Sequence, residues 1–112
     1  MAIVVITERL EKEINKKFRE ESISIFTLMH SLQDEPKKGK EIGVIGRILI
    51  KEIKYKAYRF YCITDGYKIK FLKSDEMKDL IIKFVRMSDK NSQQQVIDEI
   101  KYILRTLGVE GF

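Results

Sequence analysis

A set of residues between positions 52 and 70 combines one carboxylate with several cations and a tyrosine. Cleaving RNA requires a base for the 2′-hydroxyl proton, cations for the pentacoordinate phosphorane and an acid for the leaving 5′-oxygen. Glu52 is the only carboxylate of the set, and Lys54 and Arg59 would hold it ionised and able to act as the base. The cations neutralise phosphate, and the tyrosine can stack on an unpaired base. The set comprises Glu52, Lys54, Lys56, Arg59, Tyr61, Lys68 and Lys70.

The same residues have a simpler structural interpretation. Glu52 would then form a cross-strand ion pair on a solvated sheet, worth less than about 1 kcal/mol. Other chemistries find less support. One histidine and one cysteine cannot furnish a zinc site, and no spacing fits a nucleotide-binding loop, so we expect no metal and no cofactor. His30 is typical of a partly exposed helical residue, and Cys62 alternates in phase with core residues.

The basic residues are concentrated in one third of the chain. The formal net charge is +5, and residues 36–73 carry 11 basic but only 3 acidic side chains. Residues 1–35 carry 5 basic and 7 acidic side chains, and residues 74–112 carry 6 basic and 7 acidic side chains. A segment of this kind favours a polyanionic partner, although a solvated lysine-rich surface is the alternative.

Length and composition predict one α+β domain over residues 1–112. The apolar share is 44% and the charged share 35%, a globular composition. No apolar run approaches the roughly 20 residues that span a bilayer, and residues 2–6 are too short for a signal-peptide core. Because Cys62 is the only cysteine, no internal disulfide can form, and we expect a cytoplasmic location.

The first third of the chain predicts a strand and two helices. Residues 2–6 are mostly β-branched and predict a short buried strand. Thr7 can cap a helix that runs to about Glu21. Ser22 is another candidate cap, for a helix that ends before Pro36. Two antiparallel helices are the expected product, followed by a glycine-containing connecting loop over residues 36–46.

From Arg47 onward the apolar pattern has a period of two, which predicts strands. A turn at Lys56-Ala57 would pair Ile53 with Phe60. Asp65-Gly66 suggests a type I′ hairpin turn, which would place Cys62 opposite Ile69 and Phe60 opposite Phe71.

The C-terminal third predicts a strand and a closing helix. Residues 80–87 indicate a more fully buried strand. Ser92 and Gln95 have capping-box spacing, and the final helix is expected to stop at Gly108. The predicted fold is therefore α+β, with an N-terminal strand and helical hairpin, then an antiparallel β-meander, then a C-terminal helix.

Three stretches carry a family resemblance: 36–40 (PKKGK), 51–61 (KEIKYKAYRFY) and 84–93 (FVRMSDKNSQ). With the order of elements, they resemble the RelE/HigB/ParE superfamily of toxins from toxin–antitoxin pairs. Residues 36–40 resemble the loop after the helical hairpin of that family. Residues 51–61 resemble its central hairpin, in which an arginine follows an aromatic residue. Residues 84–93 are similar to the segment in which HigB-like members leave the last strand.

The resemblance implies a RelE-like fold and an endoribonuclease that cleaves messenger RNA on the ribosome, with its site on the exposed face of the sheet. It singles out Lys54, Arg59 and Arg86, with Glu52 as the candidate base. It also implies a small acidic antitoxin as a protein partner. The surrounding residues predicted to bind RNA are Lys51, Lys56, Tyr61, Lys68, Lys70 and Lys90.

Two alternatives stay open. The basic face can serve a non-catalytic nucleic-acid-binding protein or a ParE-like inhibitor, or the chain can be a protein–protein interaction domain, including a homodimer that uses its apolar helices. Two features separate this chain from many active members of the superfamily. No histidine or tyrosine follows Tyr102, and the connection from Tyr67 to Met77 is longer than usual.

Overall fold

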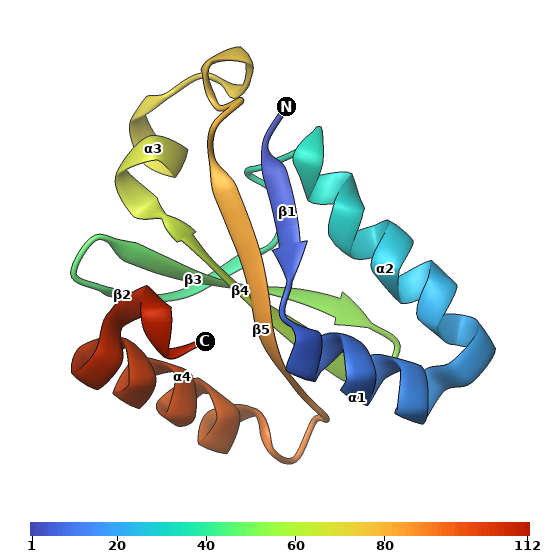
Figure 1. Cartoon of the computed structure of the whole chain (residues 1–112). Coiled ribbons are helices and arrows are strands. Elements are labelled where there is room, and N and C mark those ends of the chain that lie inside the picture. Colours follow the sequence, from blue (N-terminus) through green and yellow to red (C-terminus); the bar gives the residue numbers. More distant parts are fainter.

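The five strands of the protein form one mixed sheet. The structure is a computed structural model that describes the backbone of residues 1–112 and every side chain except that of Ser74. The strand order is β1-β5-β4-β3-β2, with β1 parallel to β5 and all other neighbours antiparallel. The strands are strongly twisted across the sheet (Figure 1). Their bounds are β1 Ile3–Ile6, β2 Lys40–Ile45, β3 Ile48–Tyr55, β4 Tyr58–Asp65 and β5 Ile81–Ser88.

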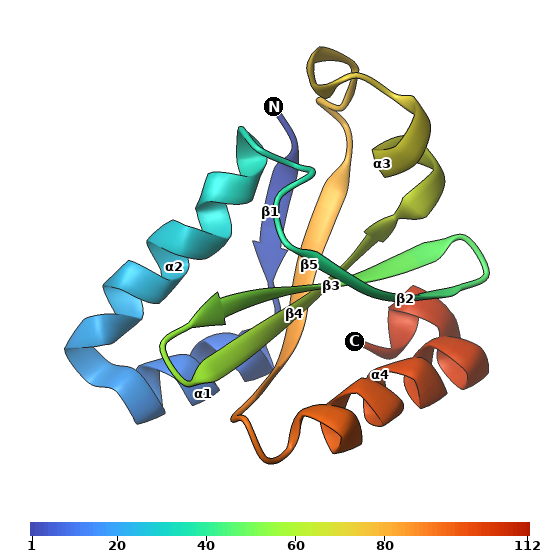
Figure 2. The same ribbon diagram turned by 180° about the vertical axis from the view of Figure 1, so that it is seen from behind.

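Helices cover both faces of this sheet, α1 and α2 on one side and α4 on the other (Figures 1 and 2). Short 3₁₀ turns follow α1, α2 and α4, and another lies between α3 and β5. The α+β class and the order of elements predicted from the sequence are confirmed. In the part of the chain that the structure describes, no helix has the length and apolarity to cross a membrane. The helices are α1 Glu8–Phe18, α2 Ser22–His30, α3 Gly66–Phe71 and α4 Gln93–Leu107.

The sheet separates two hydrophobic cores. The larger core lies beneath α1, α2 and α3, where Leu10 and Ile25 are fully buried with Phe60 of the sheet. The smaller core lies beneath α4, where Ile100 packs over Val85. Burying one such side chain stabilises the fold by roughly 1.5–3 kcal/mol. Consequently the two faces of the sheet have different neighbours, and only side chains pointing toward α4 can join a site on that side.

Several local expectations are confirmed. The Thr7 hydroxyl accepts a hydrogen bond from the Leu10 amide at the start of α1. The turn at Lys56-Ala57 pairs Ile53 with Phe60 and Lys54 with Arg59, and Lys56 adopts a positive φ of 53° to make it. This register decides which polar residues of β3 and β4 share a face.

The predicted Asp65-Gly66 hairpin is wrong. Instead of forming a turn, Asp65 caps α3, since its carboxylate accepts a hydrogen bond from the Lys68 amide. Gly66 lies where an added Cβ would come within 3.1 Å of the Arg47 carbonyl, so close packing accounts for the glycine. Ile69 still reaches the larger core, but Phe71 is 62% exposed and does not pair with Phe60.

Three smaller expectations are also wrong. Strand β2 occupies most of the loop expected over residues 36–46, because it pairs with β3 along one edge. Ser22 is the first residue of α2, and its hydroxyl donates to the Arg19 carbonyl. Ser92 makes no side-chain cap with α4, because its hydroxyl is engaged by Asp89.

Candidate functional site

Strand pairing aligns two rows of polar side chains on the face of the sheet toward α4. One row crosses four strands and holds Lys40, Glu52, Tyr61 and Arg86. The other row holds Lys54, Arg59 and Ser88. Neighbouring members of a row lie on strands about 4.8 Å apart. The two rows bring Lys40, Glu52, Lys54 and Arg59 of the basic third together on one face.

A buried pair, Glu52 and Arg59, lies at the centre of these rows. Glu52 is 7% exposed and Arg59 is 8% exposed. The Nε atom of Arg59 lies 3.9 Å from Oε1 of Glu52, which is an ion-pair distance but too long for a hydrogen bond. One terminal nitrogen of Arg59 donates to the Ala57 carbonyl at 3.1 Å. The buried Nε has no hydrogen-bond partner among the described residues.

An open pocket of about 330 Å³ lies beside this pair. Lys54 is exposed within it and Gln93, the first residue of α4, forms part of its wall. Apart from Glu52, every charged side chain that lines the pocket is a cation, so the potential there is positive. We call it the Arg59 pocket; its lining residues are Leu28, Lys38, Gly39, Lys40, Glu52, Ile53, Lys54, Arg59 and Gln93.

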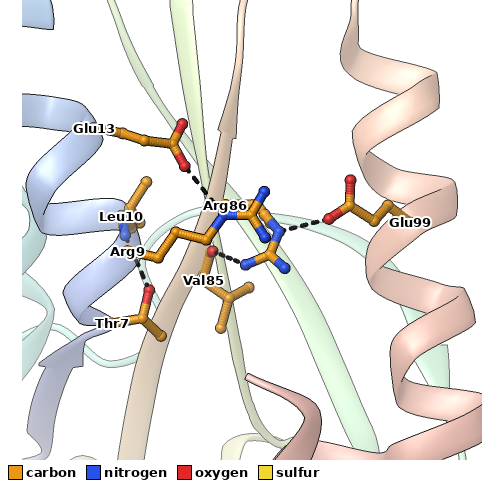
Figure 3. A network of polar contacts seen from close by, with 7 residues as sticks. All are labelled: Thr7, Arg9, Leu10, Glu13, Val85, Arg86 and Glu99. Atoms are coloured by element: carbon orange, nitrogen blue, oxygen red, sulfur yellow. Dashed lines mark hydrogen bonds and ion pairs between the residues drawn. The ribbon is translucent and has the colours of Figure 1, made fainter.

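Arg86 lies on the same face but does not line this pocket. Its Nε donates to the Glu99 carboxylate of α4 at 2.7 Å, and one terminal nitrogen donates to the Val85 carbonyl (Figure 3). Its guanidinium carbon lies 5.0 Å from the centre of the Phe112 ring. Arg86 is thus a buried cation with its charge already paired, and it anchors α4 to β5.

Tyr61 is part of the protein interior. Its side chain is 0% exposed, and its hydroxyl lies 2.8 Å from the Ser88 hydroxyl. Burial raises the pKa of the phenol, and the hydrogen bond with Ser88 partly opposes this rise. In this arrangement the ring packs in the core beneath α4 and offers no exposed face on which a base can stack.

The structure separates the remaining predicted RNA-binding residues from the Arg59 pocket. Lys51 points to the opposite face of the sheet and is 1% exposed. Lys56 is exposed at the β3–β4 turn and pairs with Glu21. Lys68 and Lys70 lie on α3, and Lys90 is exposed between β5 and α4. Of the predicted residues, only Glu52, Lys54 and Arg59 converge on one pocket.

Sequence reasoning missed three residues of the pocket with polar side chains, namely Lys38, Lys40 and Gln93. The sequence predicts a connecting loop for both lysines, whereas Lys40 belongs to β2 and pairs with Glu52. Their presence in a Lys-Lys-Gly-Lys segment was a usable signal. Gln93 could not be placed, because its position depends on how α4 crosses the sheet. No cluster of three or more potential metal ligands occurs among the residues that the structure describes.

Comparisons of the chain with protein-family models, with curated proteins and with solved structures found no match.

Proposed function

We propose that this protein is an RNA-binding endoribonuclease of the RelE/HigB/ParE toxin type, with its site in the Arg59 pocket. Glu52 acts as the base there, and Arg59 and Lys54 bind the phosphate that is cleaved. Two observations support the proposal. The sequence resemblance implies roles for Glu52, Lys54 and Arg59, and the same three residues line one pocket. A metal ion is not required by this assignment.

One observation carries the proposal: the buried Nε of Arg59 has no hydrogen-bond partner among the described residues. A buried donor left unsatisfied costs about 1–3 kcal/mol, which a small shift of the Arg59 side chain toward an oxygen atom bound in the adjacent pocket would recover. Phosphate suits this role because guanidinium–phosphate hydrogen bonds are charge-assisted and geometrically specific. Lys38, Lys40 and Lys54 add positive charge around the same space.

The chemistry follows from this placement. Glu52, which is near Arg59, takes the proton from the ribose 2′-hydroxyl. The 2′-oxygen then bonds to phosphorus, while Arg59 stabilises the negative charge of the phosphorane. The bond to the 5′-oxygen breaks, and Lys54 gives that oxygen a proton. The products are a 2′,3′-cyclic phosphate and a 5′-hydroxyl end, with no water consumed in this step.

A specific observation favours another candidate function. Arg86, the third cation implied by the resemblance, is paired with Glu99 and lies outside the pocket. With Arg86 occupied, the same pocket suits a non-catalytic RNA-binding protein. Both candidates share the phosphate site and differ only in whether the bound strand is cut.

The proposal also implies a setting and a partner. A cytoplasmic location would give the protein access to RNA and would keep the single cysteine, Cys62, reduced. A small acidic antitoxin would complement the excess of cations in residues 36–73. Finding such a protein encoded by a neighbouring gene would support this part of the proposal.

The test compares wild type with Glu52→Gln and Arg59→Lys, in cells and with purified protein. Induction in cells should arrest growth, and primer extension should map discrete new messenger RNA ends. Glu52→Gln should lower cleavage by about 10²–10⁴-fold and leave RNA binding largely intact. Arg59→Lys should weaken both RNA cleavage and RNA binding, because a lysine cannot supply the guanidinium geometry.

Matched controls separate these effects from loss of fold. Glu110→Gln and Arg105→Lys make the same chemical changes at exposed positions outside the pocket, and thermal unfolding verifies each variant. If RNA stays intact in cells, and purified, folded protein cleaves neither free nor ribosome-bound RNA, the protein is not a nuclease. Binding that Arg59→Lys weakens, without cleavage, would select the non-catalytic candidate.

A further inference from the structure

Another, larger pocket lies on the opposite face of the sheet, between α3 and strands β2 and β3. Its volume is about 760 Å³. We call it the α3 pocket. Cationic side chains line it, with Glu41 as the only carboxylate. Arg47 is paired with Asp65 at 3.0 Å, whereas Lys37, Lys51 and Lys70 form no ion pair with any described carboxylate. The pocket therefore carries an excess of positive charge.

Lys51 belongs to the wall of this pocket formed by β3, although it is only 1% exposed. Its ammonium group donates to the carbonyl oxygens of Pro36 at 2.6 Å and Lys38 at 2.5 Å. These neutral acceptors fix the position of the charge but do not neutralise it, and burial lowers the pKa of the amine. Glu41, its partner in the β2–β3 register, acts on this amine without forming an ion pair with it. A buried cation without a close counter-charge is costly, so an anionic group in the pocket would be bound favourably.

Helix α3 presents two exposed aromatic rings next to these cations. Tyr67 is 54% exposed and Phe71 is 62% exposed, with ring centres 4.8 Å apart. The guanidinium carbon of Arg47 lies 4.9 Å from the centre of the Tyr67 ring, and Nζ of Lys70 lies 5.5 Å from that of Phe71. Paired aromatic surfaces flanked by cations are suited to stacking unpaired bases.

The two pockets meet at one short basic segment. Gly39 lines both of them. On either side of it, Lys37 lines the α3 pocket, and Lys38 and Lys40 line the Arg59 pocket. Gly39 packs tightly against β3. Its φ is +104°, and an added Cβ would lie only 3.1 Å from the Glu52 carbonyl oxygen. An RNA strand bound along these lysines can therefore pass from one face of the sheet to the other around the edge formed by β2.

We propose that the α3 pocket is an additional subsite for the same single-stranded RNA, holding a phosphate near Lys51 and Lys70 and a base on Tyr67 and Phe71. The strand continues from the Arg59 pocket over residues 37–40. This continuity rests on the proposed function, whereas the charge and the Tyr67 ring belong to the α3 pocket itself, with Phe71 next to Tyr67 on α3. The ligand class is single-stranded because only unpaired bases can stack on side chains.

The experiment measures binding of 2′-O-methyl RNA, whose blocked hydroxyl prevents cleavage. Fluorescence anisotropy compares strands of about 4 and about 16 nucleotides. The double variant Tyr67→Ala/Phe71→Ala is compared with Tyr102→Ala, which removes a 65% exposed tyrosine from α4. The double variant should bind the long strand about 5-fold to 150-fold more weakly, and Tyr102→Ala should bind as wild type. The short strand, held at Arg59, should be little affected.

A strand containing 2-aminopurine gives a direct readout of stacking, and the chain contains no tryptophan to interfere. Its fluorescence should be quenched by wild type and less by the double variant. Equal binding and quenching by both proteins would overturn the α3 subsite while leaving the Arg59 site intact. If Arg59→Lys weakens neither strand but the double variant does, the α3 pocket stands and the proposed function fails. Stronger binding of an acidic, aromatic-containing peptide than of RNA, lost in the double variant, would overturn the proposal in favour of a protein partner.

Discussion

Arg86 of β5 and Glu99 of α4 form an ion pair of 2.7 Å between Nε and a carboxylate oxygen. The arginine side chain is 10% exposed and the glutamate side chain 42%. Since Arg86 also contacts the Phe112 ring, one cation links the sheet, α4 and the C-terminus. The pair therefore sets how α4 lies over the rows of polar residues, and through Gln93 it influences one wall of the Arg59 pocket.

Replacing Glu99 with glutamine should destabilise the protein by about 1–3 kcal/mol, because a buried guanidinium loses its charged acceptor. Urea unfolding followed by circular dichroism measures this change in unfolding free energy. Glu110→Gln is the matched control, because Glu110 is exposed and forms none of the ion pairs found in the described residues. Equal stabilities of the two variants would show that the pair does not anchor α4.

Gly39→Ala should be more destabilising than Gly46→Ala. Both glycines have positive φ, +104° and +60°, and this conformation alone costs a residue with a Cβ roughly 1–2 kcal/mol. Gly46 has open space around its Cβ position, whereas at Gly39 the Cβ would lie 3.1 Å from the Glu52 carbonyl oxygen. Thermal unfolding should show a clearly lower midpoint for Gly39→Ala. A lower midpoint for Gly46→Ala would contradict the tight passage of residues 37–40 over β3.

The sequence was sufficient for some features that depend on local chemistry, such as the Thr7 cap of α1. The turn at Lys56-Ala57 also fixed the β3–β4 register that places Glu52, Lys54 and Arg59 on one face. Asp65-Gly66 was ambiguous because an aspartate followed by glycine serves a hairpin turn and a helix cap equally well. In the fold, Asp65 pairs with Ile48 at the end of β4 and the Gly66 amide donates to the Arg47 carbonyl, so this dipeptide begins α3.

Features that depend on tertiary contacts could not be predicted. Lys51 lies next to Glu52 in the sequence, yet alternation along β3 places their side chains on opposite faces and in different pockets. The resemblance implies Arg86 as a site residue, but its pairing depends on where α4 brings Glu99. Burial of Tyr61 beneath α4 likewise follows from the crossing of that helix and from no local pattern.

Asp89→Ala should destabilise the protein near neutral pH but not in strong acid. Hydrogen bonds from the Ser92 amide and hydroxyl, and from the Asn91 amide, lower the pKa of Asp89 below its usual 3.8. A lowered folded-state pKa adds stability above pH 3.8, which is lost as the pH falls through the folded pKa. Urea unfolding across this range should show the two proteins converging at low pH. A difference that persists unchanged into strong acid would exclude the carboxylate as its cause.

The Cys62 thiol should resist alkylation while the protein is folded. Cys62 is 0% exposed, and burial raises the pKa of its thiol from 9.0 to about 12. Because the thiolate is the reactive form, iodoacetamide at mildly alkaline pH should label the protein only in urea. Mass spectrometry measures the labelling, and rapid labelling without denaturant would show that the strand β4 is accessible.

The same raised pKa has a consequence for alkaline stability. The folded thiol keeps its proton up to about pH 12, whereas the unfolded thiol loses it near pH 9.0. The folded state binds more protons in this window, so the free energy of unfolding should fall as the pH rises, by at most about 1.4 kcal/mol per pH unit. Cys62→Ala lacks this contribution and should show a shallower decline. Because Lys51 and the thiol interact electrostatically, the difference between the two slopes reports the thiol together with its effect on Lys51. Parallel slopes would mean that Cys62 ionises equally well in the folded and unfolded states.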